Sequence, residues 1–192
     1  MANSQTTTLI ELAREISRAL PDFQAVLGPG AGDKATHAFM RELRQQAIQA
    51  FGEDHSERKL CGETSLAADF YFQSEGTIVE VAMGLGNPFT EFEKDILKAI
   101  MAQECGFDVR RLVFICRAGG EKKCRQPGRV AMRLWAETKH GLRIEVHDLH
   151  GVPRTRKRRS LNLGMSGTAE KHAVPDLPAS AASPLRQSHG CA

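Results

Sequence analysis

Two acidic residues on neighbouring segments, Asp69 and Glu80, have the types and spacing that could do chemistry. Carboxylate oxygens are the ligands that a hard divalent cation such as Mg²⁺ takes, while it keeps several of its waters. Glu80 stands in the apolar run 77–83, TIVEVAM, where a buried carboxylate needs a partner or a metal ion. The alternative is a pair of solvated acids, since single acids are common on the polar face of a hairpin.

A predicted β-hairpin carries both acids. Residues 68–73, ADFYFQ, are rich in aromatic side chains and residues 77–83 in β-branched ones, so both segments favour strands. A two-residue loop at 75–76 would place Asp69 and Glu80 on one face as diagonal neighbours, roughly 7–8 Å apart. The other face would be apolar, formed by Phe70, Phe72, Val79 and Val81. A loop that is one residue longer would send the acids to opposite faces, so the metal hypothesis requires an even loop length.

A helix predicted over residues 91–103 follows the hairpin and carries two candidate lysines. Lys94 borders the stripe of inward-facing apolar residues, whereas the helical period turns Lys98 nearly away from that stripe. A lysine near the two acids could stabilise charge that develops on a phosphate. The alternative for both lysines is surface charge that pairs with Glu91 and Asp95 at helical spacing.

The other elements follow from hydrophobic periodicity and from turn residues. Residues 118–128, AGGEKKCRQPG, are predicted to form a basic loop. The remaining predicted elements are helices over 8–20, 35–51 and 127–140, a weak strand at 59–61, a buried strand over 111–116 and an edge strand over 142–149.

The formal net charge of +3 is unevenly distributed over the 192 residues. From Val152 onward, seven basic residues stand against two acidic ones, which leaves 19 basic and 21 acidic residues before it. Residues 151–192 are rich in Ser, Ala, Pro and Gly, so we predict a basic, disordered tail. We expect two further parts, an N-terminal helix and linker over 1–34 and an α/β domain over 35–150. Because sequence-independent binding to a duplex comes from cationic contacts, the near-neutral domain alone does not favour it.

Five cysteines without paired spacing argue against a disulfide framework and against a structural zinc site. No apolar run approaches the roughly 18 residues that a membrane span needs, and the first residues lack a signal pattern. These features predict a cytoplasmic protein with no membrane partner. A homodimer is compatible with the sequence.

The order of these elements, with Asp69 on one hairpin strand, Glu80 within the next and a helix directly after, resembles the PD-(D/E)XK nuclease superfamily. The resemblance covers about residues 35–149. It implies an α/β fold with a restriction-endonuclease-like αβββαβ core, in which helices flank a mixed central sheet. It also implies that Asp69 and Glu80 hold Mg²⁺ (or Mn²⁺), which polarises a phosphodiester of nucleic acid and activates a water for attack. The expected function is therefore that of a metal-dependent endonuclease acting on DNA.

Two positions depart from the motif of that family. Ala82 stands where the family lysine falls, and Ala68 stands in place of the proline. Some members relocate the lysine to the following helix, so the resemblance makes Lys94 the candidate catalytic lysine and Lys98 the second choice. The alternative function is a catalytically inactive nuclease-fold domain that binds nucleic acid or protein. Its contacts would come from the tail and from Lys122, Lys123, Arg125 and Arg129.

Overall fold

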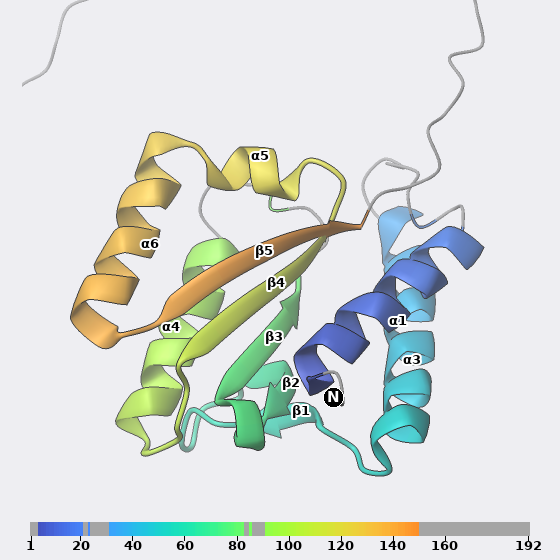
Figure 1. Cartoon of the computed structure of the whole chain (residues 1–192), viewed down its shortest axis with the longest axis horizontal. Coiled ribbons are helices and arrows are strands. Elements are labelled where there is room, and N and C mark those ends of the chain that lie inside the picture. Colours follow the sequence, from blue (N-terminus) through green and yellow to red (C-terminus); the bar gives the residue numbers. More distant parts are fainter. Residues whose placement is uncertain (1–3, 21–22, 24–30, 83–84, 86–90, 150–192) are drawn as a thin grey trace, which may run out of the picture. The chain divides into compact units, whose positions relative to one another are not determined.

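A five-stranded sheet with helices on both faces dominates the computed structural model (Figure 1). The structure describes residues 4–20, 23, 31–82, 85 and 91–149. The strands are β1 (Ser56–Lys59), β2 (Ala67–Phe72), β3 (Thr77–Val81), β4 (Arg111–Arg117) and β5 (Arg143–Leu149). The helices are α1 (Gln5–Ala19), α3 (Ala31–Phe51), α4 (Phe92–Glu104), α5 (Gly120–Cys124) and α6 (Pro127–His140).

The sheet is mixed, with its strands in the order β1-β2-β3-β4-β5. β1, β2 and β3 pair antiparallel, whereas β3, β4 and β5 pair parallel. Parallel neighbours need crossover connections, which α4 supplies between β3 and β4, and α5 with α6 between β4 and β5. Val81 pairs with Ile115, and Ile115 with His147, so the three parallel strands end at one carboxyl edge. The predicted α/β class with a mixed central sheet is confirmed at this level.

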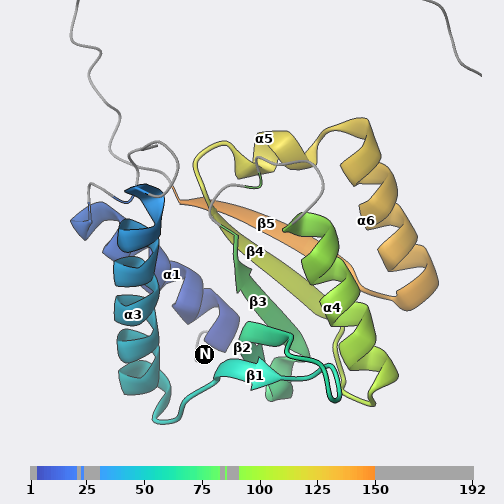
Figure 2. The same cartoon turned by 180° about the vertical axis from the view of Figure 1, so that it is seen from behind.

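Alternating side chains divide the core into two layers, one on each face of the sheet. α1 and α3 cover one face, and α4 and α6 cover the other (Figures 1 and 2). The first layer contains the predicted apolar face of the hairpin, formed by Phe70, Phe72, Val79 and Val81. The second contains Tyr71, Ile78, Leu112 and Phe114 from the sheet. The hairpin therefore follows the predicted alternation from Phe70 to Phe72 and along β3, whereas Ala68 packs in the second layer with Tyr71.

The structure corrects the prediction for two elements and extends it for two helices, since α3 begins at Ala31, inside the predicted linker, and α1 begins three residues before the predicted start. The first strand lies at 56–59, not at 59–61, and its polar side chains are tolerated because β1 is an edge strand. The segment predicted as a basic loop contains the short helix α5. α1 begins at Gln5, where the Ser4 side chain accepts a hydrogen bond from Thr7 N, and packs in the same layer as α3. The basic tail lies outside the described residues.

Candidate active site

The connection between β2 and β3 sets the register of the hairpin. Residues Gln73–Glu75 form a 3-10 turn, and Gly76 follows with a φ of 57°, a left-handed conformation that favours glycine. Phe72 pairs with Thr77 across the strands. The connection therefore has four residues and not the two that we predicted, and its length is still even.

Asp69 and Glu80 consequently lie on the same face of the sheet. The paired positions end with Phe70 and Val79, one residue short of Asp69, and the Asp69 carboxylate lies close enough to Glu80 and to Asp95 on α4 to raise the pKa of both. Asp69 Oδ2 also accepts a hydrogen bond from the backbone N–H of Val81 at 2.8 Å. The register thus meets the geometric condition of the metal hypothesis.

Helix α4 brings a lysine and a third carboxylate to Glu80. Lys98 Nζ lies 2.8 Å from Glu80 Oε1 and 3.1 Å from Asp95 Oδ1. The exposed fractions of Glu80, Asp95 and Lys98 are 3%, 5% and 5%. Asp95 and Lys98 stand three residues apart, which places them on one side of the helix. We call these three residues the buried ionic cluster.

The two candidate lysines differ sharply in their surroundings. Lys94 is exposed, whereas Lys98 is buried and contacts Glu80. The expectation that Lys98 points nearly away from the apolar side of the helix is therefore wrong. Periodicity missed it because buried residues cover most of the second half of α4, including Ile96, Ala99 and Ile100. The usable signal was a lysine within an otherwise apolar run, three residues after an aspartate.

The burial of this cluster perturbs its proton affinities. Burial raises the pKa of Glu80 well above its usual range, and the carboxylates of Asp95 and Asp69 raise it further, while Lys98 opposes them. Burial likewise raises the pKa of Asp95, against the opposing effect of Lys98. Burial alone would lower the pKa of Lys98, but the two carboxylates outweigh it and raise that pKa. Compared with the same groups in water, the two carboxyls and the lysine amine of the cluster therefore hold their protons more tightly.

Substituting Glu80 by glutamine is expected to flatten the pH dependence of stability in the metal-free protein. Because the pKa of Glu80 is higher in the folded than in the unfolded state, folding favours the protonated carboxyl. This stabilisation is complete below the ordinary pKa of 4.5 and is lost as the pH rises through the raised pKa. The slope for one proton is at most about 1.4 kcal/mol per pH unit.

Urea denaturation at a series of pH values above 4.5 measures this slope. Glu104→Gln, at the exposed end of α4, is the matched control and should keep the wild-type dependence. The Glu80→Gln variant should still show a smaller dependence of stability on pH, because the pKa of Asp95 is raised as well. A Glu80→Gln variant with the full wild-type slope would contradict this assignment.

The buried thiol of Cys61 contacts the backbone of Lys98. Cys61 Sγ donates a hydrogen bond to the carbonyl oxygen of Lys98 at 3.3 Å. Burial raises the pKa of the Cys61 thiol, so it stays protonated and serves as a donor. The turn of α4 that carries Lys98 is therefore fixed both through its side chain and through its backbone.

The donor set of the cluster suits a hard cation only in part. The carboxylates of Asp95 and Asp69 raise the pKa of Glu80, that of Asp69 also raises the pKa of Asp95, and Lys98 supplies a single positive charge against them. A divalent cation would relieve this repulsion, and carboxylate oxygens are its preferred ligands. Among the described residues, no group of three or more His, Cys, Asp or Glu side chains already has a metal-holding arrangement.

Comparisons with protein-family models, with curated proteins and with solved structures find no match for this chain. Within the part of the chain that the structure describes, no helix combines the length and apolarity that crossing a membrane requires. The fold and the buried ionic cluster are therefore the features that indicate a function.

Proposed function

We propose that this protein is a metal-dependent phosphodiesterase that cleaves nucleic acid, with DNA as its substrate, on a restriction-endonuclease-like fold. The observation that carries the proposal is the 2.8 Å contact between Lys98 Nζ and Glu80 Oε1, on the face that Asp69 shares. This contact supplies a lysine next to the paired acids, although Ala82 replaces the lysine of the motif.

The order and direction of the elements support the proposed fold. A helix, an antiparallel run of three strands, a second helix and a parallel strand follow one another from α3 to β4. This is the αβββαβ order of the restriction-endonuclease-like core. The two acids also stand on the second and third strands of that run, directly before the second helix.

Each residue of the site has a role that follows from its position. Asp69 and Glu80 would hold the metal ion, since their side chains leave adjacent strands on one face. When bound, Mg²⁺ or Mn²⁺ supplies Lewis-acid chemistry that polarises the phosphate and acidifies a water. The Lys98 ammonium would orient that water and stabilise negative charge developing on the phosphate. Asp95 acts as a positioning residue, because its contact with Lys98 holds the ammonium beside Glu80.

The second candidate function is that of a binding domain without catalysis. It is favoured because the charged groups of the same cluster pair with one another and are shielded from solvent. Glu80, Asp95 and Lys98 satisfy one another and are almost inaccessible to solvent. A buried ion pair of this kind can also specify a unique packing with no chemical role. The two functions differ in one requirement, since catalysis needs Glu80 to exchange part of its contact with Lys98 for a metal ion.

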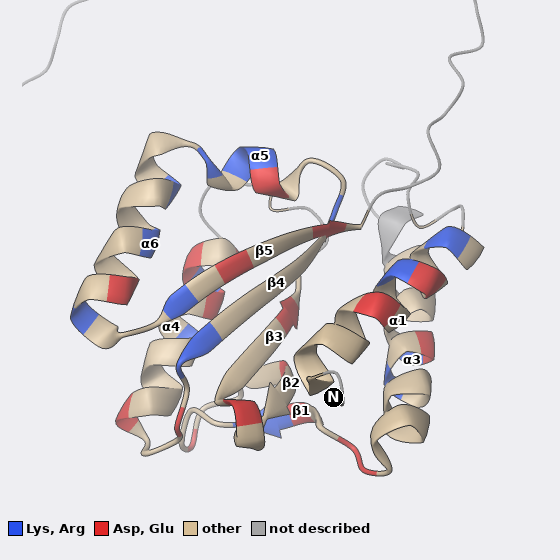
Figure 3. Cartoon of the chain, in the orientation of Figure 1, with Lys and Arg blue, Asp and Glu red and all other residues tan. Residues whose placement is uncertain are grey.

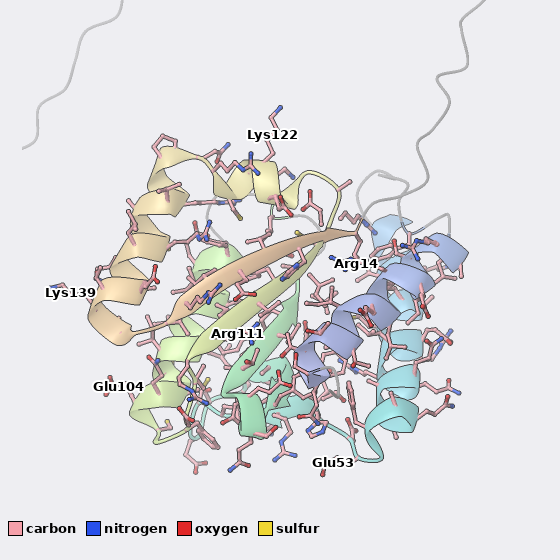
Figure 4. The ribbon with its side chains drawn as sticks, in the orientation of Figure 1. Arg14, Glu53, Glu104, Arg111, Lys122 and Lys139 are labelled. Carbon is pink, nitrogen blue, oxygen red and sulfur yellow. The ribbon has the colours of Figure 1, made fainter. Side chains whose placement is uncertain are left out.

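Cleavage of plasmid DNA, single-stranded DNA and RNA in Mg²⁺, Mn²⁺ or a chelator tests the proposal. We expect metal-dependent cleavage of DNA that falls by about 10²–10³-fold or more in Asp69→Asn and in Glu80→Gln. The matched control is Glu104→Gln, an exposed acid of α4 (labelled in Figure 4), which should cleave like the wild type. Cleavage that survives both substitutions, or a folded wild type that cleaves none of the substrates, would exclude the proposed activity.

A further inference from the structure

A cluster of cations is displayed on α5, at the carboxyl edge of the sheet. Lys122 and Arg125 are exposed and Lys123 is half-buried. Glu121, which lies 3.7 Å from Arg125, is the one acid within this helix. Figure 3 shows the resulting basic segment on α5. We call Lys122, Lys123 and Arg125 the α5 ledge.

The α5 ledge lies at the same edge as the candidate active site. The parallel strands β3, β4 and β5 end together, and α5 follows β4 directly. Arg129, near the start of α6, donates from Nη1 to the carbonyl oxygen of Leu85 at 2.8 Å. Its guanidinium also lies 5.3 Å from the ring centroid of Phe92, the first residue of α4. The corner between α5 and α6 is thus joined both to the segment after Glu80 and to the start of α4.

The backbone of α5 is held rigidly by β5. The buried Asp148 carboxylate accepts hydrogen bonds from Gly119 N at 2.7 Å and from Glu121 N at 2.8 Å. Gly120 packs so closely on β4 that an added Cβ would lie 2.1 Å from Cys116 Sγ. Asp148 therefore uses the first N–H groups of this short helix. The positive charge that α5 presents to solvent comes from its side chains.

We propose that the α5 ledge binds the phosphate backbone of double-stranded DNA next to the bond that is cleaved. The choice of partner rests on the proposed function, while the surface itself is defined by its own contacts. Cations carried by an anchored backbone segment suit the regular phosphate spacing of a duplex, whereas binding of flexible single strands relies on aromatic platforms. Residues 118–126 contain no aromatic side chain.

Charge also favours this surface over the rest of the domain. Before Val152 the chain has 19 basic and 21 acidic residues, so most of its surface does not attract a polyanion. The α5 ledge concentrates three cations within four residues at the edge where Glu80 lies. Each phosphate contact with a duplex contributes about 0.9 to the slope of log affinity against log salt concentration.

The test is a salt titration of DNA binding by the full chain carrying Glu80→Gln, in a chelator so that no cleavage occurs. The K122Q/K123Q/R125Q substitution should lower the salt slope for a fluorescent duplex by about 2–3 and weaken binding at least about tenfold. The matched control, R110Q/K139Q/R143Q, removes three exposed cations elsewhere and should bind within about twofold of the parent. Lys122 and Lys139 are labelled in Figure 4 on α5 and on the far end of α6.

The outcomes distinguish DNA binding by the α5 ledge from the proposed cleavage activity. Both substituted proteins keep residues 151–192, so any binding by the basic tail is common to them. An unchanged slope in the α5 triple variant, or equal losses in both variants, would overturn the α5 ledge even if the wild type cleaves DNA. Equal weakening on single-stranded DNA would overturn the assignment to a duplex. Selective loss of duplex binding would support the ledge even if the wild type fails to cleave.

Discussion

Lys98→Arg is expected to lower the rate of DNA cleavage by about 10²-fold or more, whereas Lys94→Arg leaves it within about twofold. The cause is position, because Lys98 Nζ contacts Glu80 while Lys94 is exposed to solvent. Arginine keeps the positive charge that the buried carboxylates require. Its planar guanidinium cannot, however, reproduce the compact, rotatable ammonium at the reacting phosphate. Single-turnover cleavage with excess protein measures the chemical step in both variants.

This comparison decides between two lysines four residues apart on α4. Lys98→Gln provides a second variant, since a neutral side chain removes the ammonium with little change in volume. Urea denaturation must show that each variant is folded at the assay temperature. A normal rate in folded Lys98→Arg and Lys98→Gln, together with a slow Lys94→Arg, would return the catalytic role to the lysine predicted from periodicity.

Lys98→Met is expected to reduce the free energy of unfolding by about 3–5 kcal/mol at neutral pH. The substitution leaves Glu80 and Asp95 buried with no cation between them, and the pKa of each is already raised by burial. The same substitution at Lys94, which is exposed, should change stability by no more than about 0.5 kcal/mol. Equilibrium denaturation in urea gives both values.

A double-mutant comparison identifies the source of this loss. In a Glu80→Gln/Asp95→Asn background no carboxylate remains in the buried ionic cluster, so Lys98→Met should cost much less than in the wild type. For residues in one buried network, the effects of two substitutions on stability are expected to deviate from their sum by about 0.5–3 kcal/mol, more than for substitutions at distant sites. Equal losses in both backgrounds would mean that Lys98 stabilises the fold by packing alone, and the ionic account of the cluster would fail.

Local sequence patterns were sufficient for the hairpin and for most of the helices. Alternation of apolar residues placed Phe70 and Val79 on one face, and Asp69 and Glu80 on the other, because the side-chain period of a strand is two residues. The loop has four residues where two were predicted, but an even difference leaves Phe70, Phe72, Val79 and Val81 on their predicted face. Likewise, Gly141 ends α6 with a φ of 61°, as its residue type indicated.

The contacts that make a candidate site of these residues come from segments that are distant in sequence. Glu80 and Lys98 are 18 residues apart, and a period count on α4 alone indicates a surface lysine at position 98. Burial becomes favourable for that lysine only because β3 presents a carboxylate to it. α5 likewise depends on Asp148, which reaches back 27 residues or more from β5 to the N–H groups at its start. Patterns along the chain specify which face a side chain occupies, whereas the pairing of charges in the interior requires the packed fold.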